Sequence, residues 1–360
     1  MSSDVTRYAG ALDHRSAWLS RGAHTRELAS DLFTTVFPGY LTLTSDPASL
    51  NIMAWVLQNR VRPGSVLSHT TAALLWDIPL PARLESGIGL LRRPGLPMRN
   101  GVAVLPPVPP GGVLGADAVL PVLHCRVPSA GSGRIGRGAI VHRTRPGATS
   151  QLGMLVVSSP AETLRELATL LPPWDMVAAI ESVIGPDGAF PGATVKILGA
   201  AFETAAGTAG TARARAALGS ARTEVKSPGE TVMRLVLEAA GFPAPVPNLP
   251  VRDPLTGQSR YIDLAWESVG FGLEYDGDDH RTTKGQWRED ENRRDELAAL
   301  GWTLARANGD DLWRPGRILR RLRRSLGERG LPVPSEQRIR RTLSMLAVKR
   351  PSLRIAPRPQ

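Results

Sequence analysis

The stretch from residue 260 to residue 308 most constrains the fold, because two strand patterns, a charged helical segment and a third strand pattern follow one another there. In "RYIDLAWE" (260–267) and "VGFGLEYD" (269–276), apolar residues alternate with polar or small ones, as in half-buried strands. A charged helix is expected at about 286–299, followed by the strand "GWTLARAN" (301–308). This order predicts an α+β fold in which a hairpin and a third strand form a mixed sheet.

A helix is predicted upstream of the hairpin, in "KSPGETVMRLVLEAAGFPAP" (226–245). Ser227, Pro228 and Glu230 stand where a capping box with a proline in the first turn would place them. Gly241 is the residue type that commonly ends a helix. Between these signals an apolar stripe is formed by Val232, Leu235, Val236 and Ala239.

Three carboxylates are expected to converge on one face of the hairpin. Glu274 and Asp276 are two residues apart in a strand, so they share a face. If the turn is symmetric about residues 268 and 269, Asp263 lies directly opposite Glu274. Like charges in this arrangement repel one another, and Mg²⁺ or Mn²⁺ bound by these oxygens would remove the repulsion. The alternative is a solvated sheet face on which the charges do not meet.

The charged helix is expected to direct polar side chains toward the same carboxylates. Gln286, Asp290 and Arg293 share a helix face with Leu297 and Leu300, which must pack inward. Inward-facing polar residues are expected to meet polar groups or a ligand. The alternative is a surface ion pair between Asp290 and Arg293, and Arg294 replaces Arg293 if the helix is rotated slightly.

The motifs "YIDLAW", "GLEYDGDDHRTTKGQWREDENRRDELAALGWTLARA" and "SPGETVMRLVLEAAGFPAP" together resemble the very-short-patch-repair-like branch of the PD-(D/E)xK nuclease superfamily. The resemblance covers roughly residues 225–320. It implies a restriction-endonuclease-like mixed sheet flanked by helices, with a metal-dependent phosphodiesterase site. By position, Glu230 is the helix acid, Asp263 the first-motif aspartate and Glu274 the second-motif acid. The capping box alone also accounts for Glu230.

Asp276 stands where the superfamily has a lysine, and this is the main departure from its pattern. That lysine would orient or activate the attacking water, which an aspartate cannot do, although it can ligate a metal. His280 is the expected replacement as general base or acid. The predicted metal ligands are Asp263, Glu274 and Asp276. The resemblance also matches His280, Gln286, Asp290 and Arg293 to positions that this branch favours.

Residues 1–81 are predicted to form a small, mainly helical unit of the winged helix-turn-helix type. "SVLSHTTAALLWDIPLP" (65–81) indicates a helix that Ser68 caps, and "PGYLTLTS" (38–45) indicates a β-wing. Residues 82–198 are expected to form a β-containing module that helices at 159–171 and 173–185 close. With "HTREL" and "SSPAETLRELATL", these pieces resemble the winged-helix antitoxin family of abortive-infection systems. That resemblance implies DNA binding or transcriptional regulation, and His69 is expected to be structural.

The positive charge of the chain is concentrated at its C-terminus. The chain has 44 Lys and Arg against 33 Asp and Glu, whereas residues 314–360 alone have 14 against 2. In "GRILRRLRRSLG" (316–327) one face is apolar and the other is rich in arginine, so a DNA backbone contact is expected. RNA or an anionic membrane surface would satisfy the same charge. The four arginines of this prediction are Arg320, Arg321, Arg323 and Arg324.

The predicted segments are a winged-helix-like domain at 1–81, the β-containing module at 82–198, a linker or loose helix at 199–224, a nuclease-like domain at 225–326 and a basic tail at 327–360. No apolar run reaches the length of a membrane span, and the N-terminus lacks the apolar core of a signal peptide. A cytoplasmic location without a membrane partner is therefore expected. The single Cys125 forms no internal disulfide, and the sequence indicates no Cys/His zinc cluster.

These patterns predict a Mg²⁺-dependent DNA endonuclease or nickase whose N-terminal domain binds DNA, with a role in defence or repair. A toxin or another defence component is a candidate partner, while the target, the strand choice and the oligomeric state are not predicted. The alternative is a catalytically inactive, DNA-binding regulator of the antitoxin type.

Overall fold

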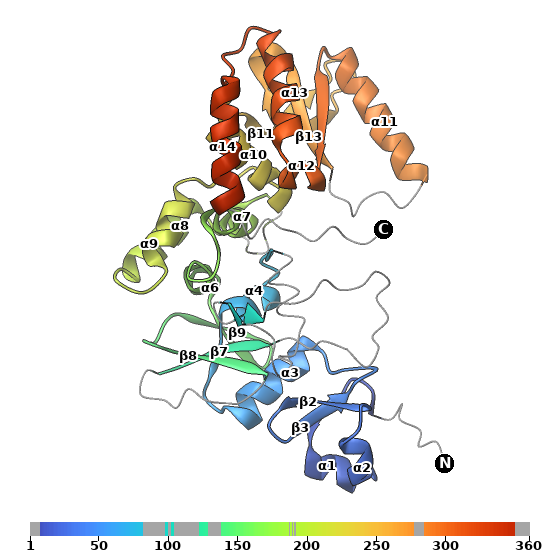
Figure 1. Cartoon of the computed structure of the whole chain (residues 1–360), viewed down its shortest axis with the longest axis vertical. Helices are drawn as coiled ribbons and strands as arrows, with labels where there is room; N and C mark the ends of the chain where they lie inside the picture. Colours follow the sequence, from blue (N-terminus) through green and yellow to red (C-terminus); the bar gives the residue numbers. More distant parts are fainter. Residues whose placement is uncertain are drawn as a thin grey trace. The chain divides into compact units, whose positions relative to one another are not determined.

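Figure 1 shows the computed structural model of the chain, which has a mixed α+β architecture. It describes residues 8–81, 98–99, 102–103, 122–128, 138–186, 188, 190, 192–276 and 284–349. The described residues form two compact units: an N-terminal unit (up to 170, with 200–214) and a C-terminal unit (171–199, with 215–349). Within the described ranges, no helix combines the length and apolar character that crossing a bilayer requires.

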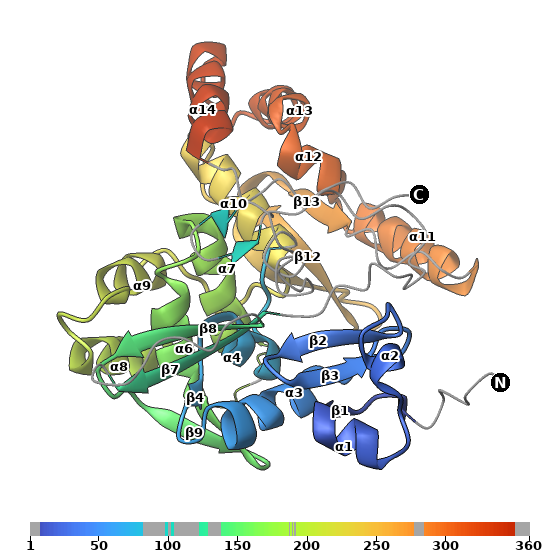
Figure 2. The same cartoon turned by 60° about the horizontal axis from the view of Figure 1, so that its bottom comes forward.

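The N-terminal unit begins with a three-stranded antiparallel sheet in the order β1-β3-β2. The predicted β-wing overlaps the β2–β3 hairpin, whose turn uses Gly39 at φ +81°. Trp18 is fully buried beneath this sheet and donates a hydrogen bond from Nε1 to the carbonyl of Leu41. Figure 2 shows the helices beside the hairpin. The elements are β1 (Leu12–His14), α1 (Arg15–Ser20), α2 (Thr25–Leu28), β2 (Phe33–Phe37) and β3 (Tyr40–Leu43).

A five-stranded mixed sheet in the order β8-β7-β4-β10-β9 completes the N-terminal unit. The helix predicted after Ser68 is present as α4, and both α4 and β4 pack with this second sheet although they fall inside the predicted 1–81 unit. The helix predicted at 159–171 is also present, as α6. The elements are α3 (Leu50–Val56), β4 (Val66–Leu67), α4 (His69–Leu75), β7 (Leu123–Pro128), β8 (Ala139–Thr144), β9 (Thr149–Leu152), β10 (Leu155–Ser158) and α6 (Pro160–Leu167). A short π-helical turn (Leu57–Val61) extends α3, and β5 (Met98–Arg99) pairs with β6 (Val102–Ala103).

The predicted linker at 199–224 is largely helical. The helix α8 (Val195–Thr204) enters this segment and α9 (Thr211–Leu218) lies inside it. Ala214 and Leu218 of α9 are buried, which is why an Ala- and Gly-rich sequence is ordered here. The helix predicted at 173–185 is present as α7 (Pro173–Ile184).

The C-terminal unit is built on a four-stranded mixed sheet in the order β11-β12-β13-β14. The hairpin of β12 and β13 is antiparallel, β14 runs parallel to β13, and β11 is an edge strand that the sequence patterns did not predict. The predicted capped helix is α10, which begins after Ser227 and ends at Gly241 in the left-handed conformation. The elements are α10 (Pro228–Ala240), β11 (Val246–Arg252), β12 (Ser259–Trp266), β13 (Phe271–Asp276), α11 (Lys284–Ala299) and β14 (Thr303–Asn308).

Helices cover both faces of this sheet. On one face, Leu264 and Leu273 pack against α10 and three C-terminal helices, and on the other, Ile262 and Ala265 pack against Leu297 of α11. Figure 1 shows α11 on the side of the sheet opposite α13 and α14. The C-terminal helices are α12 (Gly309–Trp313), α13 (Gly316–Gly327) and α14 (Glu336–Lys349).

The segment after residue 326 is not wholly a tail. Ile339 and Leu346 of α14 join the buried core of the C-terminal unit, and Thr342 donates a hydrogen bond to the carbonyl of Ala239. Between its basic residues α14 has an apolar stripe, and because this stripe is buried, the helix belongs to the folded unit. Residues 350–360 lie outside the described part of the chain.

Candidate functional site

The predicted carboxylates lie at the end of the β12–β13 hairpin. The strands pair as Leu264–Leu273, Ala265–Gly272 and Trp266–Phe271, and Asp263 and Glu274 are the residues next to the first of these pairs. The carboxylate of Asp263 accepts a hydrogen bond from the backbone N–H of Tyr275 at 2.8 Å. The hairpin therefore fixes the orientation of Asp263 relative to the strand that carries Glu274.

Burial makes these carboxylates unfavourable as isolated charges. Burial raises the pKa of Asp263 above its ordinary value, and the nearby charge of Asp276 raises it further. Burial likewise raises the pKa of Glu274, with a further contribution from Asp263. A cation that binds both carboxylates would offset this cost.

Glu230 joins this site from the first turn of α10. Its backbone N–H donates to Ser227 Oγ at 3.2 Å, which is one half of the predicted capping box, but its carboxylate accepts from the backbone N–H of Lys226, at 3.2 Å, and not from that of Ser227. Glu230 is also buried, and burial together with the charge of Asp263 raises its pKa to about 7. The structural and the functional explanation of Glu230 are therefore compatible. Its hydrogen bonds lie at the start of the helix, and the nearby charge of Asp263 raises its pKa.

Arg293 is the cation that the structure brings to the acids. Its Nη2 lies 2.8 Å from Oε1 of Glu274, and the same nitrogen donates to the carbonyl oxygen of Tyr261. Arg294 instead pairs with Glu291 at 2.9 Å. Arg293 rather than Arg294 therefore makes the ion pair with Glu274, on the helix that buries Leu297.

Two further cations near the acids were not predicted from the sequence. Lys226 lowers the pKa of both Glu230 and Asp263 through its charge, and its Nζ lies 4.5 Å above the ring of Tyr261. Arg306 of β14 is paired with Glu274 in the sheet register. Arg306 could have been found from the sequence by pairing β14 in parallel with β13. Lys226 could not, because only the tertiary fold brings it close to the acids.

Part of the predicted site lies outside what the structure describes. His280 is in the segment 277–283, and the side chains of Gln286 and Asp290 are not described, although both residues belong to α11. Asp276 is partly buried at the end of β13. The roles predicted for these residues stay predictions.

The donor atoms of the site suit Mg²⁺ or Mn²⁺. Asp263 and Glu274 offer carboxylate oxygens only, and Mg²⁺ needs one or two such ligands because it keeps several waters. Oε1 of Glu274 is buried and accepts no hydrogen bond of ordinary geometry from the described residues, despite its proximity to Arg293. Within the same residues, the acids do not form a group of three whose oxygens all lie within 4.8 Å of one another.

The arginines predicted to contact DNA line the outer face of α13. Ile318, Leu319, Leu322 and Leu326 are buried on the opposite face, as the periodicity predicts. Arg320 pairs with Glu336 at 2.8 Å, and Arg323 donates to the carbonyl of Pro334. The exposed arginines of this face are Arg320, Arg321, Arg323 and Arg324.

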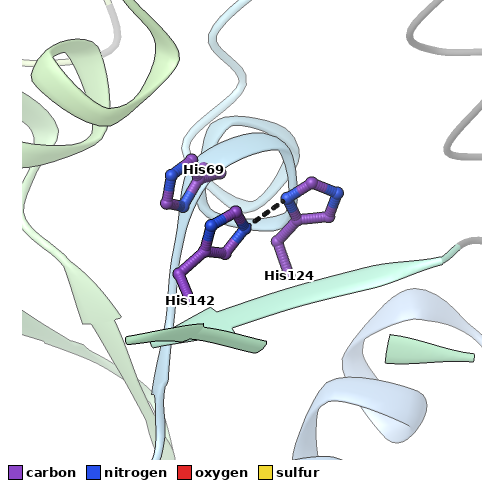
Figure 3. Close-up of side chains that lie close together, drawn as sticks. All are labelled: His69, His124 and His142. Carbon is purple, nitrogen blue, oxygen red and sulfur yellow. Dashed lines mark hydrogen bonds between the residues drawn. The ribbon is translucent and has the colours of Figure 1, made fainter. Parts of the chain in front are cut away.

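A histidine cluster in the N-terminal unit shows that the expectation of no Cys/His cluster is wrong. His69, His124 and His142 offer ligand nitrogens that all lie within 4.8 Å of one another, and Figure 3 shows the three rings together. Burial lowers the pKa of His124 to about 3 and that of His142 to about 4. The sequence separations of 55 and 18 residues match no zinc-motif spacing, and only the pairing of strands β7 and β8 beneath α4 brings the residues together.

Comparison with known proteins gives partial similarity. The sequence matches no protein-family model. It is 31% identical over 121 residues to two proteins of Mycobacterium tuberculosis, uncharacterized protein Rv2248 of strain H37Rv and uncharacterized protein MT2308 of strain CDC 1551. The matched region is 33% of this chain, and the chain spans 44% of the length of each relative.

Proposed function

We propose that the C-terminal unit is a metal-dependent DNA endonuclease or nickase of the PD-(D/E)xK type. The observation that carries the proposal is the convergence of Asp263, Glu274 and Glu230, with raised pKa values, at the end of a mixed sheet. Carboxylates held in this state favour a bound cation, and perturbed acids are concentrated in functional sites.

Asp263 and Glu274 would hold Mg²⁺ or Mn²⁺, with Asp276 as a third candidate ligand. When bound, such an ion polarises a phosphodiester and lowers the pKa of a coordinated water. The hydrogen bond from Tyr275 N–H holds Asp263 in place, and Arg293 orients Glu274. Glu230, with a pKa of about 7, exchanges a proton readily at neutral pH and is the described residue best placed to act as general acid or base.

DNA affinity would come from both units. In the N-terminal unit, the sheet order β1-β3-β2, the two preceding helices and the β2–β3 hairpin agree with a winged helix-turn-helix. His24, Thr25 and Arg26 at the start of α2 are exposed, as a reading helix requires. The arginine face of α13 would add backbone contacts. A role in defence or repair, with a toxin or another defence component as partner, is part of this proposal.

A second candidate is a DNA-binding regulator of the antitoxin type whose nuclease fold is inactive. The ion pair between Arg293 and Glu274 favours it, because a guanidinium already neutralises one of the two proposed ligands. Asp276 at the position of the superfamily lysine favours it as well. This candidate predicts salt-dependent DNA binding without any requirement for metal.

Nicking of supercoiled plasmid DNA in Mg²⁺ or Mn²⁺ separates the two candidates. The wild type is expected to nick the plasmid, and Asp263→Ala and Glu274→Ala are expected to fall to the level seen with chelator. Glu267→Ala is the matched control, because Glu267 is an exposed acid in the turn of the same hairpin. If the wild type and both site variants leave the plasmid intact while binding it, the regulator is the correct candidate.

A further inference from the structure

The three histidines of the N-terminal unit form a compact group with mutual nitrogen contacts. Nε2 of His142 lies 3.0 Å from Nδ1 of His124, so the two imidazoles share one proton in a hydrogen bond. The rings of His69 and His142 are stacked with centroids 3.6 Å apart and an interplanar angle of 15°. Figure 3 shows all three rings between the helix α4 and the strands beneath it.

The fold builds this group from three separate elements. In the parallel pair β7–β8, Arg126 is opposite His142, and His124 is two residues from Arg126, so both histidines face the same side of the sheet. His69 starts α4, and the backbone N–H of Ser68 donates to the carbonyl of His124 at 3.0 Å. These backbone constraints place the histidines on one side of the sheet without help from their imidazoles.

His69 adopts a backbone conformation that is unfavourable for its residue type. Its φ is +51°, a region that glycine enters freely and other residues enter at a cost. Its backbone N–H donates to Oε2 of Glu166 at 3.0 Å, which holds it in this conformation. Strain of this kind is concentrated where a side chain must point in one direction for function.

The buried carboxylate of Glu166 lies next to His69, the first of the three histidines. Nδ1 of His69 lies 3.0 Å from Ser68 Oγ and 3.9 Å from the carboxylate of Glu166. Glu166 in turn accepts from Ser158 Oγ at 3.2 Å and lies 3.3 Å from Nε of Arg126. Metal-bound histidines usually direct their second ring nitrogen at such a partner, which fixes the ring orientation.

We propose that His69, His124 and His142 bind a divalent transition-metal ion of the zinc class, in a site separate from the acidic site of the C-terminal unit. Imidazole nitrogens suit Zn²⁺, Co²⁺ or Ni²⁺, whereas Mg²⁺ prefers oxygen. With Nδ1 of His69 engaged by Ser68, its Nε2 is the ligand atom. For both nitrogens to bind the ion, the imidazole that carries the proton between His124 and His142 takes up its other tautomer, so each ring stays neutral and no net proton is released.

The nitrogens are close enough for one ion, but the ring of His69 must turn, because it is stacked nearly parallel to that of His142 and parallel rings do not direct their nitrogen lone pairs at one point. Tetrahedral zinc with Zn–N distances of about 2.1 Å places its ligand nitrogens about 3.4 Å apart. The nitrogens of His124 and His142 are already at 3.0 Å, and the third lies within 4.8 Å. The fourth position is available to water, because His142 is partly exposed. The bound ion would tie α4 to β7 and β8 and so stabilise the N-terminal unit.

The test measures zinc bound by the full-length chain after chelation and reconstitution. We expect one tightly bound zinc ion per chain, a higher melting temperature with zinc, and the visible spectrum of tetrahedral cobalt when Co²⁺ is used instead. His124→Ala and His142→Gln are expected to lose the ion and the cobalt spectrum. Ser68→Ala is expected to weaken binding by about 10- to 100-fold, because it removes the partner of a ligand ring.

His24→Asn is the matched control, since it removes an exposed histidine and keeps a residue type that caps helices. Equal zinc binding by the wild type and by folded His142→Gln would overturn the proposal, because zinc would then sit elsewhere. Absence of a tetrahedral cobalt spectrum in the wild type would overturn it as well, and this measurement does not depend on any variant folding. Excess Mg²⁺ is expected not to displace the zinc.

Discussion

At the scale of single residues, the acidic site depends on which residue supplies positive charge. Asp276 supplies none, whereas Lys226 does. Under the proposed nuclease function, Asp276 stands where the resemblance implies a lysine, and an aspartate cannot stabilise negative charge on a phosphate. Lys226, which directly precedes the capped helix, acts electrostatically on both Glu230 and Asp263. Its ammonium group lies over the ring of Tyr261, so its position is set by a second contact. Under the proposed nuclease function, Lys226 is thus the candidate to stabilise negative charge on a bound phosphate.

Replacement of Lys226 by methionine tests this role. We expect Lys226→Met to keep the fold and to reduce metal-dependent nicking by about 100-fold or more, as the loss of one group that stabilises developing charge does. Lys196→Met, which alters an exposed lysine of α8, is expected to nick like the wild type. Undiminished nicking by Lys226→Met, in a preparation where Asp263→Ala is inactive, would rule out the role.

The acids were predictable from the sequence, whereas the groups around them were not. Asp263 and Glu274 were predicted from strand alternation and hairpin symmetry, which are local properties, although Ile262 and Leu264 on either side of Asp263 pack on opposite faces of the sheet. Lys226 reaches Asp263 only because α10 packs on the sheet, and His69 meets His124 only because α4 lies over β7. No spacing in the sequence encodes these tertiary contacts.

At the scale of elements, a buried ion pair joins α7 to α10. Arg234 is fully buried, and its Nη2 lies 2.5 Å from Oε1 of Glu181. Glu181 also accepts hydrogen bonds from the backbone of Arg222 and from Thr231 Oγ1. The carboxylate has several donors at once, so its burial is tolerated.

Arg234→Met is therefore expected to destabilise the C-terminal unit by about 3–5 kcal/mol, because Glu181 would stay buried without its countercharge. The free energy of unfolding in urea measures the effect. Arg340→Met provides the control, because Arg340 is exposed on α14, and it is expected to change stability by less than about 0.5 kcal/mol. A cost below about 1 kcal/mol for Arg234→Met would show that the pair contributes little.

The elements that the sequence predicted best are those with local signals. The N-cap Ser227 and the left-handed Gly241 bound α10 as expected. The strand β11 was missed because Pro247 and Pro250 argue against a strand, and both are tolerated here because β11 is an edge strand. The helix α14 was missed because the segment was assigned to a tail from its high arginine content, and its apolar stripe was not considered.

The contact between α13 and α14 should depend on pH. Arg320 and then Arg340 lower the pKa of Glu336 below its ordinary value. The stabilisation by ionised Glu336 is therefore present above the ordinary pKa of 4.5 and is lost as the pH falls through the lowered value. We expect Glu336→Gln to speed amide hydrogen exchange of α14 at neutral pH and to match the wild type in acid. About 1 M salt should reduce the difference, because the pair is exposed, and Glu328→Gln is the control.

At the scale of the whole molecule, the charge distribution suits a protein that binds a polyanion through its C-terminal helices. The first 313 residues are nearly neutral in sum, and the excess of arginine begins with the segment that forms α13. Because the apolar stripe of α13 is buried in the core, its arginine face must point outward. DNA affinity by counterion release would follow from this arrangement with either candidate function.

The salt dependence of DNA binding measures this contribution in the full chain. Arg320 and Arg323 already bond within the unit, so Arg321 and Arg324 are the better probes. We expect Arg321→Gln with Arg324→Gln to weaken binding to plasmid DNA and to reduce the slope of log affinity against log salt by about 0.9 for each phosphate that the variant no longer neutralises. Arg252→Gln, an exposed position on β11, is expected to leave the slope unchanged. An unchanged slope in the double variant would place the polyanion-binding surface away from α13. A larger loss of affinity for RNA than for DNA would identify RNA as the preferred polyanion.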